Sequence, residues 1–229
     1  MHSTLVVYED TNKDDALRLA AIIGNAKALD IRFLDTADVG KYTHVVAFGT
    51  TAKPVAAEVL LSKDCSVANE GKELRRRFDQ ADGNVMEPAL LRVRIEEFLK
   101  AHNSCALATA SDGLVRSTPI EYGYRDGCLF FLTEGGLKFI GLSRCAVSIA
   151  DPYVRFGKLA GFEAQGSLTE IPADSPLYGE ILKEKQVDPS VLARSPITMH
   201  MLRFAIKEGE MLCSTFHLDG YGVRQYFTW

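Results

Sequence analysis

The sequence has 229 residues, of which 47% are hydrophobic and 24% are charged, a composition that excludes an intrinsically disordered chain. With 26 basic and 30 acidic residues the formal net charge is −4, so a general nucleic-acid-binding surface, which needs a net basic face, is not expected. No apolar run approaches the roughly 20 residues that cross a bilayer. Residues 1–9 also lack the basic start and the cleavage site of a signal peptide.

Cysteine and histidine positions predict neither a disulfide framework nor a metal site. The five cysteines have wide spacings and no CxxC pair, which is typical of reduced, mostly buried thiols in a cytoplasmic protein. The five histidines are scattered, and none stands with a carboxylate at the spacing of metal ligands. We therefore expect a cytoplasmic protein without a metal and without a membrane or nucleic-acid partner.

The first 84 residues alternate between strand and helix patterns. Apolar runs at residues 5–8, 31–34 and 44–48 predict strands, and apolar residues at helical spacing predict helices over residues 14–28 and 54–61. Strands separated by helices favour a parallel sheet. The stretch that follows is dense in both signs of charge, which indicates a solvated helix face. A small α/β module is therefore predicted over residues 1–84.

From residue 85 onward the pattern changes to short strands separated by turns. Asp112-Gly113 and Asp126-Gly127 are hairpin-turn signals, and glycines inside a long later strand suggest a bulge or bend. The predicted elements are helices over residues 90–102, 135–143 and 174–186, and strands over residues 104–110, 115–124, 128–133, 146–150, 160–171, 202–206 and 210–216. Six or seven short antiparallel strands suggest a small closed barrel.

Polar residues that suit a phosphate lie within this second region. The sequence has no GxSxG, P-loop or HExxH motif. In the strand after the first hairpin, Arg116 and Thr118 share one face and Ser117 takes the other. Lys138 follows Thr133, at the end of an aromatic strand, within five residues. A guanidinium, an ammonium and hydroxyls from neighbouring elements suit a phosphate dianion, and apolar walls beside them suit a flat ring.

Residues 88–229 resemble the FMN-binding split-barrel family, whose best-known members are the pyridoxamine 5′-phosphate oxidases. The resemblance rests on a helix followed in order by Ala106-Leu107-Ala108-Thr109, Asp112-Gly113, Arg116-Ser117-Thr118-Pro119-Ile120, Asp126-Gly127, Leu129-Phe130-Phe131-Leu132-Thr133, Lys138, Ala146-Val147-Ser148-Ile149 and Gln165-Gly166. It implies a six-stranded antiparallel split β-barrel over residues 85–229, and a homodimer with FMN at the subunit interface. The FMN-binding residues that it implies are Arg116 and Lys138 at the phosphate, Ser117 and Thr118 along the flavin, Pro119 and Ile120 near the ring, and Leu132 and Thr133 on a second strand.

The sequence departs from the oxidases at positions that they use for their substrate and cofactor. Leu137 stands where they carry a second basic residue, and the segment 222–225 lacks the histidine of their Arg-x-His pair. A glutamine of the oxidases is replaced by Gly161. These departures argue against oxidation of pyridoxine phosphate itself and favour the broader relatives of the family.

An FMN-binding flavoprotein is therefore the predicted function. We expect an oxidoreductase that passes electrons or hydride from a small donor through FMN to an unknown small acceptor. No residue stands out as a general acid or base; Tyr122, Tyr124 and His217 are candidates for substrate contact. An alternative is a non-catalytic protein that binds flavin, or haem with His200 or His217 as an axial ligand. A third is a dimeric scaffold without a cofactor.

Two further features have more than one interpretation. The first module loosely resembles a shortened flavodoxin-like fold, but the loop over residues 9–12 is acidic and lacks glycine, so we expect no phosphate site there. Trp229 is the only tryptophan and the last residue. It either covers a flavin across the dimer or anchors the chain end against the barrel, and anchoring is favoured.

Overall fold

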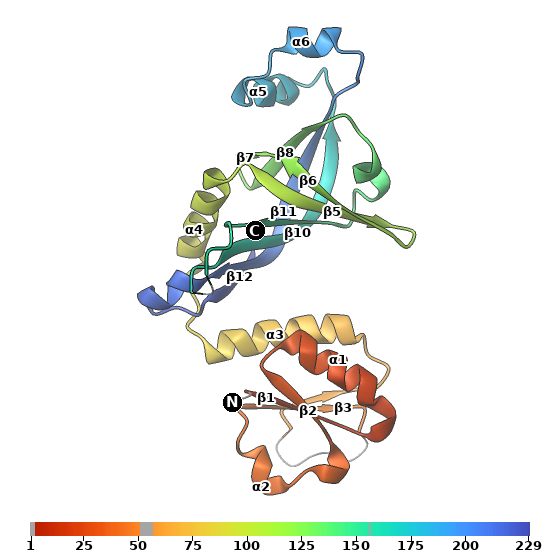
Figure 1. Cartoon of the computed structure of the whole chain (residues 1–229), viewed down its shortest axis with the longest axis vertical. Helices are drawn as coiled ribbons and strands as arrows, with labels where there is room; N and C mark the ends of the chain where they lie inside the picture. Colours follow the sequence, from red (N-terminus) through yellow and green to blue (C-terminus); the bar gives the residue numbers. More distant parts are fainter. Residues whose placement is uncertain (1–2, 51–56, 156) are drawn as a thin grey trace. The chain divides into compact units, whose positions relative to one another are not determined.

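A computed structural model describes residues 3–50, 57–155 and 157–229 (Figure 1). The chain divides into two compact units, Met1–Asp82 and Gly83–Trp229. This division lies two residues before the predicted boundary after residue 84. Among the described residues, no helix combines the length and the apolar character needed to span a bilayer.

The N-terminal unit is built on a parallel sheet with the strand order β2-β1-β3-β4. Its elements are β1 (Thr4–Tyr8), η1 (Asp10–Asn12), α1 (Lys13–Ile23), β2 (Ala26–Asp30), η2 (Ile31–Phe33), α2 (Thr36–Val39), β3 (His44–Phe48), β4 (Val59–Leu61) and α3 (Val67–Asp82). Val6 and Phe48 pack in one buried cluster with residues of α1 and α3, whereas Leu5 and Val45 pack in another with Val39 of α2. The two clusters arise because side chains alternate along each strand.

Two of the predicted elements in this unit are wrong. The second strand is β2, at Ala26–Asp30, and residues 31–33 form a 3₁₀ turn. The reason is that α1 ends at Ile23, where Gly24 takes a positive φ of 72° and stops the helix. Residues 59–61 form strand β4 beside β3 instead of a helix. The rest of that predicted helix, residues 51–56, lies outside the described residues.

His44 joins three elements of the N-terminal unit. Its ring is buried at the start of β3 and stacks on Phe78 of α3, with 4.0 Å between ring centroids. Nδ1 lies 2.8 Å from Glu58 Oε1, and Nε2 lies 3.1 Å from Asp82 Oδ1, both within hydrogen-bonding distance. The imidazole therefore ties the last residue of α3 to β3 and to the segment before β4.

The C-terminal unit contains an antiparallel sheet with the strand order β6-β5-β9-β10-β11-β8-β7, to which β12 adds beside β11. Its strands are β5 (Ser104–Ser111), β6 (Leu114–Glu121), β7 (Gly123–Arg125), β8 (Cys128–Thr133), β9 (Cys145–Ala150), β10 (Ala160–Ile171), β11 (His200–Cys213) and β12 (Arg224–Thr228). Its helices are α4 (Pro88–Ala101), η3 (Leu137–Ile140), α5 (Pro176–Glu184), α6 (Pro189–Arg194) and η4 (Ser214–Asp219). The sheet curls into a half-barrel, because β6 and β7 stand at opposite ends of the strand order and only Tyr122 separates them in the chain.

The sheet has eight strands, rather than the six of the predicted barrel. Residues 202–206 and 210–216 were expected as separate strands, but β11 runs without a break from His200 to Cys213. Gly209 allows this, because a Cβ there would lie 2.0 Å from the carbonyl oxygen of Glu163 on β10. The predicted bulge is confirmed at Gln165/Gly166, where the register between β10 and β11 shifts. Strand β12 and helix α6 were not predicted.

Both Asp-Gly hairpin turns are confirmed. Asp112 and Gly113 have φ values of 50° and 77°, and Asp126 and Gly127 have 49° and 75°. Positive φ at both central residues is the requirement of a type I′ turn, which Asp-Gly meets at low cost. The amphipathic helix is also confirmed as α4, with its apolar face in the core.

Two apolar cores lie on opposite faces of the curled sheet. Phe131 packs with Ile95 of α4 on one face, and Phe130 packs with Ile181 of α5 on the other.

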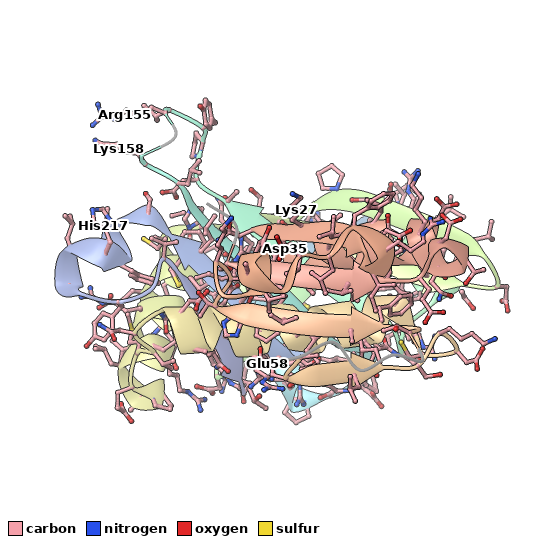
Figure 2. All side chains as sticks on the ribbon, turned by 90° about the horizontal axis from the view of Figure 1, so that it is seen from below. Lys27, Asp35, Glu58, Arg155, Lys158 and His217 are labelled. Carbon is pink, nitrogen blue, oxygen red and sulfur yellow. The ribbon has the colours of Figure 1, made fainter. Side chains whose placement is uncertain are left out.

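All five cysteines are free, and burial raises the pKa of Cys105 to about 12. Figure 2 shows Arg155 and Lys158 on the segment between β9 and β10, which stands out from the sheet.

Trp229 is anchored against the C-terminal unit. Its backbone N–H donates to the carbonyl of Lys207 at 2.7 Å, and the Arg92 guanidinium lies 4.4 Å from its ring centroid. A Cβ at Gly127 would lie 2.0 Å from its Nε1. The indole therefore fills the space over the second hairpin turn, in the anchoring arrangement favoured above.

Candidate functional site

Strand β6 divides its predicted site residues between two faces. Across the ladder with β5, Arg116 lies opposite Thr109, and Thr118 lies opposite Leu107. Directly opposite residues share a face, so Arg116 and Thr118 stand on the same side as the buried Thr109 and Leu107. Residues of the opposite parity, Ser117 and Pro119, stand on the other face, whereas Ile120 returns to the first and packs against the core.

The outer edge of β6 is open. In the described part of the chain β6 pairs only with β5, and Arg116, Ser117 and Pro119 are exposed. Pro119 is tolerated because an edge strand does not need its N–H for the ladder. The remaining backbone N–H and C=O groups along this edge are available to a ligand.

The other predicted residues lie at the end of β8 and on η3. Thr133 is buried as the last residue of β8, and Lys138 is on η3, which packs against β5 and β6. Gly141 allows this packing, because a Cβ there would lie 2.1 Å from the carbonyl oxygen of Ala110 on β5. The side chain of Leu132 lies on the face of β8 opposite to that of Thr133, where it packs against the core beneath α5. Only the backbone of Leu132 can therefore contribute to a site that includes the Thr133 side chain.

Arg116 and Lys138 bring to this region two positive charges that no described residue compensates. Neither Arg116 nor Lys138 makes a hydrogen bond or ion pair with any described residue. They come from β6 and η3, which are neighbours. Guanidinium and ammonium groups left without a partner attract an anion, and a guanidinium can hold a phosphate through two parallel hydrogen bonds.

Two residues of this region could not be found by sequence reasoning. The Thr109 side chain, only 2% exposed, keeps a hydroxyl without a hydrogen-bond partner among the described residues, opposite Arg116. Gly141 brings η3 against the β5–β6 hairpin. The places of Thr109 and Gly141 in this region depend on the register between β5 and β6 and on the path of η3. Neither the register nor the path leaves a local sequence pattern.

The phenols considered for substrate contact are structural. Tyr122 is buried, and its hydroxyl donates to the carbonyl of Leu99 at 2.8 Å. Burial raises the pKa of Tyr122 above its usual range and the pKa of Tyr124 to about 12. The Tyr124 oxygen accepts a hydrogen bond from the N–H of Gly127. Neither phenol is therefore poised to accept a proton at neutral pH.

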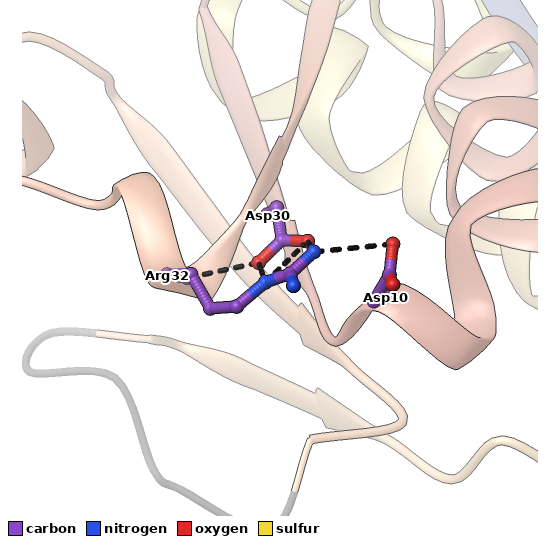
Figure 3. A network of polar contacts seen from close by, with 3 residues as sticks. All are labelled: Asp10, Asp30 and Arg32. Atoms are coloured by element: carbon purple, nitrogen blue, oxygen red, sulfur yellow. Dashed lines mark hydrogen bonds and ion pairs between the residues drawn. The ribbon is translucent and has the colours of Figure 1, made fainter.

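In the N-terminal unit, the carboxyl ends of the strands are filled by the chain's own polar groups. Figure 3 shows Arg32 between Asp30 and Asp10, with Nη2 at 2.7 Å from Asp30 Oδ2 and 3.2 Å from Asp10 Oδ1. Asn12 Nδ2 donates to the carbonyl of Gly49 at 2.9 Å. Ligands of open α/β sheets bind at this edge, where Arg32 is already engaged by two carboxylates.

Acid is expected to weaken the N-terminal unit through Asp30. Hydrogen bonds from Arg32 lower the pKa of Asp30. A folded-state pKa below the unfolded value, about 3.9, means that this stabilisation is complete above that value and is lost as the pH falls through the folded pKa. Thermal melting of the full chain between about pH 2 and 6 should show a smaller acid loss in Asp30→Asn than in wild type.

The exposed Asp64→Asn variant is the matched control for this measurement. It changes the charge in the same way without removing a partner of Arg32, so its melting profile should follow wild type. Identical acid profiles in Asp30→Asn and wild type would contradict the assignment.

Comparisons with known proteins give matches among solved structures. No protein-family model matches the sequence, and no curated protein matches it at a significant level. A FAD-binding protein from Mesorhizobium loti matches with 20% identity and a TM-score of 0.40, over 55% of this chain and 93% of that one. HutZ, the haem storage protein of Vibrio cholerae, matches with 12% identity and a TM-score of 0.44, over 54% and 94%.

A proposed pyridoxamine 5′-phosphate oxidase from Corynebacterium glutamicum matches with 11% identity and a TM-score of 0.43, over 64% of this chain and 99% of that one. Two of these three solved structures are named as a FAD-binding protein and a proposed pyridoxamine 5′-phosphate oxidase, and all three are at most 20% identical to this chain.

Proposed function

We propose that the C-terminal unit binds FMN, with the phosphate between Arg116 and Lys138. The observation that carries this proposal is the pair of cations without a described partner, brought from β6 and η3 to one end of the half-barrel. The motif order that resembles the FMN-binding split-barrel family supports the same placement. A phosphate dianion would compensate both charges at once.

The remaining contacts of the flavin come from the open strand edge. Ser117, Thr118, Pro119 and Ile120 continue along β6 from the phosphate end, and a strand rises about 3.3 Å per residue. The ring would therefore lie beside Pro119 and Ile120. Thr133 and the backbone of Leu132 would border it from the second strand.

We propose that the protein is an FMN-dependent oxidoreductase. FMN, when bound, supplies the transfer of electrons or hydride from a small donor to a small acceptor. This chain supplies the grip on the phosphate, the strand edge that positions the ring and the apolar wall beside it. Oxidation of pyridoxine phosphate itself is not part of the proposal, because the segment 222–225 lacks the histidine that the oxidases use.

A homodimer with FMN at its interface is part of the proposal. Leu114, Val115 and Leu137 are 61%, 80% and 59% exposed, at the tip of the β5–β6 hairpin and on η3. Apolar side chains exposed beside an open strand edge are typical of a surface that another protein covers. A second copy would bury this edge together with the flavin.

The five free cysteines support a reducing, cytoplasmic location.

The N-terminal unit is proposed to be a shortened flavodoxin-like module without its own flavin. Its strand order, β2-β1-β3-β4, follows the first four positions of the flavodoxin-like order 2-1-3-4-5. Its acidic first loop contains Glu9 and Asp10 where a phosphate would need donors.

The absorbance spectrum of the purified full chain tests the proposal. Oxidised flavin is expected to give a band near 450 nm, whereas haem would give a strong band near 400 nm (approximate positions for these cofactor classes). Denaturation should release the chromophore for identification as FMN by chromatography. A colourless protein that also fails to quench the fluorescence of added FMN would contradict flavin binding, and a haem spectrum would favour the alternative function.

A further inference from the structure

His200 is held at the same end of the half-barrel by two elements. It is the first residue of β11 and lies directly opposite Thr133 on β8. Its Nδ1 donates to Glu170 Oε1 on β10 at 2.5 Å. The ring of Phe139 on η3 meets it edge-on, with 5.2 Å between centroids. The imidazole is therefore fixed in position and orientation rather than mobile on the surface.

The other side of the imidazole borders the loop that leads to Lys138. Gly135 and Gly136 both have positive φ, at 90° and 92°. A Cβ at Gly135 would lie 3.7 Å from His200 Nε2, and a Cβ at Gly136 would lie 4.0 Å from Lys138 Nζ. The imidazole and the ammonium therefore lie over neighbouring glycines, where no side chain separates them from the backbone.

The geometry leaves Nε2 as the ligand-facing atom of His200. A carboxylate that accepts from one ring nitrogen fixes the ring and directs the other nitrogen outward. Nε2 makes no hydrogen bond to any described residue. A phosphate oxygen accepts from a ring N–H, and a protonated phosphate oxygen donates to a bare ring nitrogen, so Nε2 is able to form a hydrogen bond with a phosphate group.

We propose that His200 is a third phosphate-binding residue of the flavin site, beside Arg116 and Lys138, and that Glu170 positions it. This inference rests on the proposed binding of FMN. It assigns a ligand-facing role to a residue that the motif resemblance does not include. In the purely structural alternative, the His200–Glu170 pair only links β10 to β11.

Parallel titrations with FMN and riboflavin test the proposal, because the two ligands differ only in the phosphate. His200→Ala is expected to weaken FMN binding about tenfold, the effect of one hydrogen bond to a charged group, and to leave riboflavin binding unchanged. His200→Gln should recover part of the loss, because its amide can donate from a similar position. Glu170→Ala should weaken FMN binding less than His200→Ala. Lys27→Ala, which removes an exposed side chain from β2 of the N-terminal unit, is the control and should bind FMN as wild type does.

The outcomes separate this inference from the proposed function. Wild-type protein that binds neither FMN nor riboflavin would overturn both. Selective loss of FMN affinity in Arg116→Ala, with wild-type affinity in His200→Ala, would retain the flavin site and overturn the role of His200. Equal losses for FMN and riboflavin in both His200→Ala and His200→Gln would also overturn it, because the side chain would then act through the fold.

Discussion

Replacing Arg116 with alanine is expected to weaken FMN binding by about 1.5–3 kcal/mol, the range for hydrogen bonds to a charged group. This corresponds to a roughly 10- to 150-fold rise in Kd. The reason is that Arg116 has no protein partner in the described chain, so its guanidinium is free to take two phosphate oxygens. Titration of the purified protein with FMN, followed by flavin fluorescence, measures the change.

Charge and geometry are separated by two companion variants. Arg116→Lys keeps the charge but loses the two-pronged donor, so its affinity should lie between those of wild type and Arg116→Ala. Arg18→Ala removes an exposed arginine of α1 in the N-terminal unit and makes the same change in net charge. Its FMN affinity should stay at the wild-type value. An unchanged affinity in Arg116→Ala would remove this residue from the site.

Replacing Gly127 with alanine is expected to destabilise the C-terminal unit by about 2–5 kcal/mol. Two costs combine in this value. The first is the left-handed backbone at φ 75°, about 1–2 kcal/mol for a residue with a Cβ. The second is overpacking, about 1–3 kcal/mol, because the new Cβ would lie 2.0 Å from Trp229 Nε1. Urea unfolding followed by circular dichroism measures the loss.

Gly113 is the matched control for this variant. It stands in the other Asp-Gly turn with φ 77°, and nothing lies within 4 Å of the position where its Cβ would be. Gly113→Ala should therefore cost only the backbone part, about 1–2 kcal/mol. Adding Trp229→Ala to Gly127→Ala should remove the overpacking part, whereas purely additive effects of the two substitutions would show that the indole does not oppose the Cβ.

Local chemistry explains which elements could be predicted from the sequence. Asp112-Gly113 and Asp126-Gly127 set their turns through the positive φ that these residues tolerate, and α4 follows from its apolar spacing. Strand β4 could not be predicted, because three residues become a strand only when β3 offers them an edge. The shift of β2 similarly depends on where Gly24 stops α1.

The candidate site was predictable only in part. Alternation along one strand places Arg116 and Thr118 on a common face, and this needs no knowledge of the fold. The approach of Lys138 to that strand depends on Gly141 against Ala110, a contact between segments about 30 residues apart in sequence. The position of His200 depends on the pairing of β11 with β8. Such long-range pairings are set by packing of the whole sheet and leave no short motif.

The anchored position of Trp229 provides an intrinsic fluorescence donor for measuring its distance to a bound flavin. Because the chain has a single tryptophan, all of its indole emission arises from one point, held beside Arg92 and the second hairpin turn. Flavins absorb in the region where indole emits, so a flavin bound as proposed would quench the tryptophan emission by resonance energy transfer. The efficiency of transfer falls steeply with separation and therefore reports the distance from the chain end to the isoalloxazine, without any attached label.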